Sequence, residues 1–144
     1  MKTGVGLILT ARSTGRMLVL KELKSKPEIE KIAGMVSFPL ETMKNGESKE
    51  AAISRLVDEE IGSAISEKPV FFGGTFSIVQ NANTLAAYAF CDEEFTPKPA
   101  DDDVEFYGWL HPDELIRPGL FVRKEVGPIM EAFALISEKD QAMF

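Results

Sequence analysis

The sequence predicts an α/β (α+β) sandwich, and three observations lead to this prediction. Apolar segments of strand length recur along the chain and are separated by turn residues. Two longer segments have the apolar spacing of amphipathic helices. These helical segments alternate with the strand-like ones instead of forming a separate block. With 144 residues, 44% of them hydrophobic and 27% charged, we expect one domain spanning 1–144 with its own core.

The first two strands are expected to form a hairpin. Residues 4–10 (GVGLILT) are typical of a buried strand, 13–15 (STG) supply a turn, and 17–21 (MLVLK) are the partner strand. Residues 22–33 form a charged connector, and the short apolar segment 35–38 follows it.

A helix is expected after the loop that ends at Gly46. Ser48 is a good N-cap residue, because its hydroxyl can accept a backbone N–H of the first turn. The apolar spacing then continues from about Lys49 to Ile61, and Gly62 is a C-terminal stop.

The second half of the chain adds strands and a closing helix. Gly73 and Gly74 interrupt the first of these strands and predict a β-bulge. The expected elements are strands over 70–79, 84–91 and 104–110, a helical turn opened by Pro112, and an amphipathic helix over 123–137, for which Pro128 is an alternative start.

Composition excludes several classes of function. A net charge of −7 argues against extensive nucleic-acid binding, which needs clustered Lys and Arg. No apolar run reaches the roughly 20 residues that span a bilayer, and no signal peptide is evident. The single cysteine, Cys91, rules out an intrachain disulfide and suits a reducing cytoplasm, with a buried structural thiol as the expected role.

The end of the first helix carries adjacent acids, which are costly to hold together unless a positive group binds them. At about 100° per residue, Ile53, Val57 and Ile61 form the core stripe. A second face, distinct from the centre of that stripe, carries Ala52, Leu56, Glu59 and Glu60. Arg55 precedes Glu59 by four residues, the spacing of a side-chain pair. The alternative is a solvated helix end with one surface salt bridge.

The spacing of these residues resembles the signature of the Nudix hydrolases, which cleave diphosphates with divalent metals. That signature is a glycine, five residues, Glu, seven residues, then Arg-Glu-aliphatic-x-Glu-Glu-x-Gly-aliphatic. Six of its nine specified positions match without gaps, namely Glu47, Arg55, Val57, Glu59, Glu60 and Gly62. The flanking Phe38-Pro39 and the segment Asp103–Trp109 (DVEFYGW) also resemble the family, so the resemblance covers nearly the whole chain.

The resemblance implies a mixed β-sheet packed between helices and a magnesium- or manganese-dependent attack of water on a diphosphate. It implies a small nucleotide as substrate, and it leaves a homodimer possible. Glu59 and Glu60 are the implied metal ligands. Arg55, Glu59 and Asp103 are the implied catalytic residues.

Leu56 is the departure from the signature with the largest consequence. It stands where the family has a glutamate implicated as metal ligand or general base. Leucine can neither bind a metal nor accept a proton, and loss of a well-placed base costs typically about 10²–10⁴-fold in rate. If the chain is an impaired enzyme, Leu56→Glu is expected to raise its activity. The other departures are Leu40 and Glu41 in place of two glycines and Ser63 in place of an aliphatic residue.

Other acids are candidates to compensate for Leu56. They are Glu41, Glu47, Asp102 and Glu105, together with Asp103. The alternative interpretation treats Glu41 as an exposed loop residue and 101–103 as a solvated turn. Glu47 lies a dozen residues before Glu59, so a role at the helix start or as partner of Arg55 is favoured over ligation of the same ion.

Two functions from different classes follow. The first is a divalent-metal-dependent hydrolase that cleaves the diphosphate linkage of a nucleoside diphosphate derivative or a nucleoside triphosphate. The second is a catalytically weak or inactive Nudix-fold protein that binds a nucleotide as a regulator, because Leu56 replaces a signature glutamate.

Overall fold

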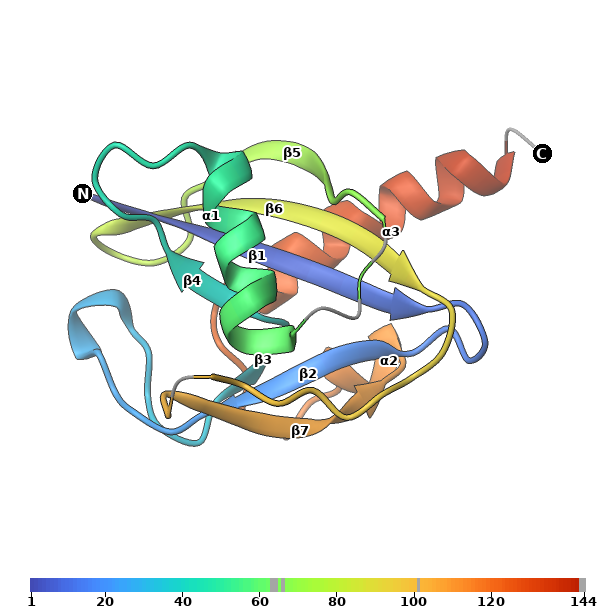
Figure 1. The fold of residues 1–144 in the computed structure, drawn as a ribbon, viewed down its shortest axis with the longest axis horizontal. Helices are drawn as coiled ribbons and strands as arrows, with labels where there is room; N and C mark the ends of the chain where they lie inside the picture. Colours follow the sequence, from blue (N-terminus) through green and yellow to red (C-terminus); the bar gives the residue numbers. More distant parts are fainter. Residues whose placement is uncertain (63–64, 66, 101, 143–144) are drawn as a thin grey trace.

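A computed structural model describes residues 1–62, 65, 67–100 and 102–142, with side chains described as far as residue 136. Ser63 and Asp101, both considered above, lie outside the described residues. The described strands form one mixed sheet with helix α1 on one face and helix α3 on the other (Figure 1). The strands are β1 (Lys2–Ala11), β2 (Met17–Glu22), β3 (Val36–Ser37), β4 (Leu40–Thr42), β5 (Val70–Phe76), β6 (Ala82–Cys91) and β7 (Val104–Leu110). The helices are the 3₁₀ turn η1 (Pro27–Ile29), α1 (Lys49–Leu56), the π-helical turn η2 (Val57–Ile61), α2 (Pro112–Leu115) and α3 (Val126–Ala142).

The central strand β1 pairs in parallel with β6 over its whole length, from Lys2 opposite Ala82 to Ala11 opposite Cys91. On its other edge, β1 meets β2 at Thr10 and Met17. The two strands then diverge, and β4 takes the place of β2 beside β1. Strand β2 pairs instead with β7 and β3. The sheet therefore opens between the start of β1 and the end of β2.

Close contact at Gly6 lets the short strand β4 fit against β1. Gly6 lies opposite Leu40, and a Cβ at this position would stand 2.7 Å from Leu40 Cδ2 and 3.0 Å from Phe38 Cε2. A Cβ here would force the Leu40 and Phe38 side chains to move, because real Cβ contacts are not that short. Gly6 thus helps to define one wall of the opening.

Alternation along the strands divides the core into two layers. Leu7 and Leu9 of β1 pack towards α1, whereas Ile8 packs with Ile129 of α3. The predicted sandwich with a mixed sheet between helices is therefore confirmed. None of the described helices combines the length and apolar character needed to cross a membrane.

The predicted strands are confirmed, with shifts at some ends. The register of β5 and β6 slips between Phe72 and Thr75, which confirms the bulge at the glycine pair. Strand β5 ends at Phe76 instead of Val79, because the chain there turns towards β6 through Asn81, whose φ is +65°. The last helix begins at Val126, between the two predicted starts.

Helix α1 and η2 together span the predicted 49–61. Ser48 Oγ accepts the Ala51 N–H at 3.1 Å, and Gly62 has a φ of +93°, as a C-terminal stop requires. The last turn differs from the prediction, since Gly62 N donates to Val57 O, five residues back. A turn with this spacing is wider than an α-helical turn, so the rotation of about 100° per residue no longer holds after Leu56.

The predicted division of the helix into a core stripe and a second face also needs correction. Leu56 and Ala52 are fully buried in the core beneath α1, together with Ile53. Val57, predicted at the centre of the core stripe, is half-buried. The buried stripe is wide enough to include the row of Ala52 and Leu56, as expected of a helix lying flat on a sheet.

Candidate active site

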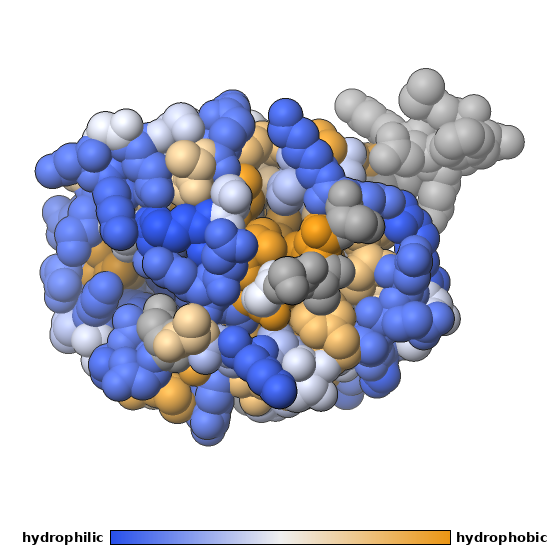
Figure 2. Space-filling view, viewed as in Figure 1, coloured by the Kyte–Doolittle hydropathy of each residue, from blue (hydrophilic) through white to orange (hydrophobic). Residues whose placement is uncertain are grey.

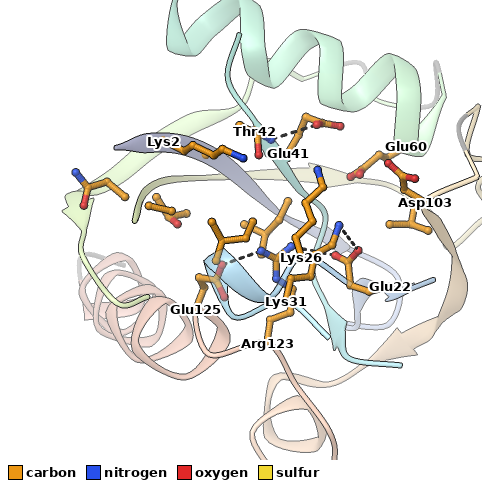
Figure 3. A pocket seen from close by; sticks show the side chains of 17 residues that line it. Lys2, Glu22, Lys26, Lys31, Glu41, Thr42, Glu60, Asp103, Arg123 and Glu125 are labelled. Atoms are coloured by element: carbon orange, nitrogen blue, oxygen red, sulfur yellow. Dashed lines mark hydrogen bonds and ion pairs between the residues drawn. The ribbon is translucent and has the colours of Figure 1, made fainter. Parts of the chain in front are cut away.

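A polar pocket occupies the opening between β1 and β2. Its walls come from the starts of β1, β6 and β7, the end of β2, the segment around η1, strand β4, the end of η2 and the residues just before α3 (Figure 3). The cavity has a volume of about 50 Å³. Its charged lining comprises the acids Glu22, Glu41, Glu60, Asp103 and Glu125 and the cations Lys2, Lys26, Lys31 and Arg123.

Arg55 links the helix to the strand and loop that precede it. Its guanidinium binds Glu47 with two hydrogen bonds, Nε to Oε2 at 2.9 Å and Nη2 to Oε1 at 3.0 Å. It also donates to Thr42 O at 2.8 Å and to Glu59 Oε2 at 3.2 Å, and it lies 3.8 Å from Glu41 Oε1. The predicted pairings of Arg55 with Glu59 and with Glu47 are both confirmed. A bidentate arginine–carboxylate interaction of this kind holds both side chains in place.

The bond to Arg55, together with the Lys44 backbone N–H, lowers the pKa of Glu47 to about 2. A carboxylate whose pKa is lowered by folding stabilises the fold above its ordinary pKa and loses that contribution as the pH falls towards the folded value. For Glu47 this window runs from about pH 5 down to about 2.

We therefore expect Glu47→Gln to lower the melting temperature at pH 7 and to lower it progressively less between pH 5 and pH 3. Thermal unfolding of both proteins across this range measures the difference. Glu50→Gln, at an exposed position of the same helix, is the control and should show no such trend. A difference between wild type and Glu47→Gln that does not change with pH would contradict the assignment.

The two adjacent acids, Glu59 and Glu60, point in different directions. Glu59 is held by Arg55 and does not line the pocket in the described part of the chain. Glu60 is only 3% exposed and lines the pocket at the foot of the helix. The prediction had placed both side chains on one face, whereas in the structure Glu59 pairs with Arg55 and only Glu60 of the two lines the pocket.

Two of the other candidate acids also reach the pocket. Glu41 lies on β4 and is half-buried, so the interpretation of an exposed loop residue is wrong. Asp103, just before β7, lines the pocket beside Glu60 and pairs with Lys24 Nζ at 3.0 Å. Asp102 binds the same lysine from outside, with its side chain 88% exposed. Glu105 is exposed opposite Lys21 of β2.

The acids fit a metal ion only in part. Within 1–62, 65, 67–100 and 102–142, no three His, Cys, Asp or Glu side chains are grouped so that they could hold an ion by themselves. Magnesium is commonly bound by one or two carboxylates together with waters and substrate phosphates. Glu60 and Asp103, which lie beside each other in the pocket, fit that need, whereas Glu59 is engaged by Arg55.

Sequence reasoning missed a chain of buried ions at the other end of the pocket. Arg123 Nη1 donates to Glu22 Oε1 at 3.0 Å, and its Nη2 donates to Glu125 Oε2 at 2.9 Å. Lys31 Nζ lies 3.2 Å from Glu22 Oε2. One signal was available, because strand alternation puts Glu22 on the same face as Leu18 and Leu20. Its partners come from sequence positions that no local pattern connects to it.

A second cavity, of about 730 Å³, lies on the outer side of α1. Its apolar wall includes Ile53, Val57 and Phe71, and apolar side chains gather beside the helix in Figure 2. This groove explains why Val57 is only half-buried. Of the acids proposed for catalysis, none lines it in the described residues.

Comparison with known proteins identifies the class to which this fold and site belong. The model of one family, described as the NUDIX domain, matches residues 1–132. The chain belongs to the Nudix family, and this membership supports hydrolase activity in general. No curated protein sequence matches the chain significantly.

Similar solved structures share the fold at low sequence identity. The MutT Nudix hydrolase from Burkholderia pseudomallei has a TM-score of 0.66 and 20% identity, covering 91% of this chain and 96% of its own. A Nudix hydrolase from Nitrosomonas europaea has a TM-score of 0.70 and 17% identity, with coverages of 93% and 88%. The MutT protein from Methanosarcina mazei Go1 has a TM-score of 0.67 and 15% identity, with coverages of 96% and 94%.

Proposed function

We propose that this protein is a metal-dependent hydrolase that cleaves the diphosphate linkage of a nucleoside diphosphate derivative or a nucleoside triphosphate. The observation that carries the proposal is the convergence of Glu60, Asp103 and Glu41 on one pocket of a Nudix-family chain. These acids come from a helix end and two strands that are far apart in sequence. The proposal includes a small nucleotide as partner and a cytoplasmic location.

Glu60 and Asp103 are the residues that would hold Mg²⁺ or Mn²⁺. Such an ion neutralises phosphate oxygens and lowers the pKa of a bound water. Lys2 and Lys26 line the same pocket and form no ion pair in the described part of the chain, so their ammonium groups are available to phosphate oxygens.

Arg55 and Glu59 have a positioning role in this proposal. Arg55 binds Glu47 and Thr42 O, and so holds the helix that carries Glu60 against β4. Glu59 also pairs with the Arg55 guanidinium. It is a second candidate metal ligand, available to the ion when it leaves Arg55. Asp103 is the proposed acceptor of the water proton, and Glu41 is the alternative.

One observation favours the second candidate function, a nucleotide-binding protein with little catalysis. Leu56 is buried in the core, so no acid from this position of the signature reaches the pocket. The pocket acids would then serve to bind a nucleotide through a metal ion without activating a water.

A screen of phosphate and nucleotide release separates the two functions. The protein is incubated with nucleoside triphosphates and nucleoside diphosphate derivatives in Mg²⁺, in Mn²⁺ and in a chelator. Hydrolysis that requires the metal is the expected result. Nucleotide binding seen by calorimetry, without turnover in either metal, would favour the regulatory function. The absence of both binding and turnover would exclude both functions.

Asp103→Asn and Glu41→Gln identify the proton acceptor. We expect the variant at the acceptor to lose about 10²–10⁴-fold in kcat, as general bases typically contribute, and to lose the acidic limb of the pH–rate profile. The other variant should keep that limb. Retention of the limb in both variants would place the proton acceptor elsewhere.

A further inference from the structure

We propose that residues 24–33 form a lid that swings away from the pocket to admit the substrate, and that Glu30 is the latch that holds this lid closed. The role rests on the proposed function, because the lid forms one wall of the pocket in which the diphosphate would be cleaved. The lid contains η1 and is the light-blue loop in Figure 1.

With the lid closed, the pocket is too small for a nucleotide. Its volume is about 50 Å³, whereas pockets that bind ligands of that size typically measure about 300–1,000 Å³. Lys26, Ile29 and Lys31 of the lid line the cavity, and Lys26 lies between its two ends (Figure 3). One wall must therefore move before the proposed substrate can bind, and it must move back to bring Lys26 to the phosphates.

Most of the other walls are fixed by the sheet and the core. Strand β1 pairs with β6 over its whole length, and β4 pairs with β1. Glu60 lies at the end of η2, next to Ile61, which is buried in the core. By contrast, the backbone–backbone hydrogen bonds of the lid, within the described residues, join it only to itself and to Met35 at its base. The lid is therefore a wall whose movement leaves the sheet intact.

The lid is a small hairpin that can move as one body. Lys26 N donates to Lys31 O at 2.8 Å, and Lys31 N donates to Lys26 O at 3.2 Å. Ser25 Oγ accepts the Ala33 N–H at 2.8 Å. Gly34, at the base, has a φ of +96°, which glycine adopts without strain. A few residues at the end of an element commonly form a hinge, so the base of the lid is the expected hinge.

Two ion pairs lie at the base of the lid. Lys31 Nζ lies 3.2 Å from Glu22 Oε2, and Lys24 Nζ lies 3.0 Å from Asp103 Oδ1. Both acids belong to the framework beside the base, since Glu22 ends β2 and Asp103 directly precedes β7. Contacts close to a hinge change little when the far end swings, so these pairs are compatible with opening.

At its tip, the lid is held by side-chain contacts across a gap. Glu30 Oε2 accepts the Gln80 N–H at 3.0 Å, and Glu30 Oε1 pairs with Lys124 Nζ. Asn81 Nδ2 donates to Glu28 O at 3.1 Å. These contacts tie the tip to the turn between β5 and β6 and to the segment before α3. Opening therefore requires Glu30 to leave both of its partners.

The latch residue is held in an unusual backbone conformation. Glu30 has a φ of +57°, which residues other than glycine seldom adopt unless surrounding contacts hold them there. Lys124 and the Gln80 N–H lower the pKa of the Glu30 carboxyl, so it is charged at neutral pH. The ion pair favours the closed lid, whereas the backbone of Glu30 can relax once the side chain is released. These opposing effects suit a latch that must open as well as close.

Labelling of a thiol beneath the lid measures opening. Ile29, which is 6% exposed, is changed to cysteine in a protein whose native thiol is removed by Cys91→Ser, and its reaction with a maleimide is followed. Glu30→Ala should accelerate labelling roughly fivefold or more, because it removes both latch contacts. Glu28→Ala is the matched control and should not change the rate. Glu28 is exposed on the same turn and binds Asn81 through its carbonyl, which the substitution keeps.

Nucleotide association in the otherwise native protein covers the case in which Ile29→Cys does not fold. A fluorescent methylanthraniloyl derivative of ATP is mixed with the protein in Mg²⁺ by stopped flow. If lid opening limits association, Glu30→Ala should raise the limiting rate at high nucleotide roughly fivefold or more, and Glu28→Ala should not.

The two measurements separate the lid from the proposed function. Faster labelling in Glu30→Ala alone supports the lid, even if no nucleotide is bound or hydrolysed and the proposed function fails. Metal-dependent hydrolysis, combined with labelling and association rates that Glu30→Ala does not change, overturns the lid and leaves the proposed function standing. Equal acceleration by Glu30→Ala and Glu28→Ala also overturns the assignment of Glu30 as the latch.

Discussion

Leu56→Glu is expected to destabilise the protein severely and not to restore activity. Leu56 is fully buried among Leu7, Leu9 and the other residues beneath α1, and it does not line the pocket in the described residues. Full burial raises the pKa of a carboxyl by about 3–5 units, and each unit corresponds to about 1.36 kcal/mol. A folded pKa raised this far lies above 7, so the buried carboxyl is protonated at pH 7 and the ionisation cost there is set by the gap between pH 7 and the unfolded pKa of about 4.3. This cost is about 4 kcal/mol, a large share of the stability of a typical domain, about 5–15 kcal/mol.

Denaturant unfolding of Leu56→Glu and of Leu56→Met measures this effect. The methionine variant conserves volume and should lose less than about 1.5 kcal/mol. The penalty of the glutamate variant should shrink as the pH falls to about 4, because the unfolded carboxyl is then also protonated. The sequence led us to expect that Leu56→Glu raises activity, and this requires the helix to turn position 56 into the pocket. A stable Leu56→Glu protein with increased metal-dependent hydrolysis would show that the helix can do so.

Glu60→Gln is expected to reduce metal-dependent hydrolysis by at least about 100-fold, because loss of even an outer-shell partner of a metal ligand costs about 10–100-fold. Glu60 is the member of the acid pair that lines the pocket, and glutamine replaces it with nearly the same shape. The fold should remain stable, because glutamine fills nearly the same space at this buried position.

Glu59→Gln is the matched control, since its side chain is engaged by Arg55 outside the pocket. We expect the fold reduction in activity caused by Glu59→Gln to be less than about a tenth of the fold reduction caused by Glu60→Gln, because Glu59→Gln weakens only a positioning contact. Calorimetric titration with Mg²⁺ and Mn²⁺ should show weaker binding in Glu60→Gln alone. Equal losses in both variants would show that both acids bind the ion, as the family resemblance implies, and that Glu59 leaves Arg55 to do so.

Local patterns in the sequence predicted those features that depend on neighbours along the chain. Ser48 and Gly62 bound the helix because capping depends on backbone groups within one turn. Arg55 finds Glu59 because four residues on a helix bring two side chains together. The glycine pair predicted the bulge in β5, since a residue without Cβ adopts positive φ without strain.

Prediction failed where the outcome depended on contacts with distant segments. The wheel placed Leu56 on one face with the two acids, whereas packing of α1 on the sheet buries Leu56 in the core and only Glu60 of the two acids lines the pocket. The sequence left two interpretations of Glu41, an exposed loop residue or a site residue. The pairing of its strand, β4, with β1 decided between them.

By itself, the sequence determined the order of strands and helices, the helix with its arginine and paired acids, and the family resemblance, because all of these reside in local spacing. Only the tertiary structure decided which acid faces the pocket and what lies across from it. The buried chain of Glu22, Lys31, Arg123 and Glu125 exists because β2 diverges from β1 and the segment before α3 enters the gap. Such contacts join residues as much as 101 positions apart, and no periodicity along the chain encodes them.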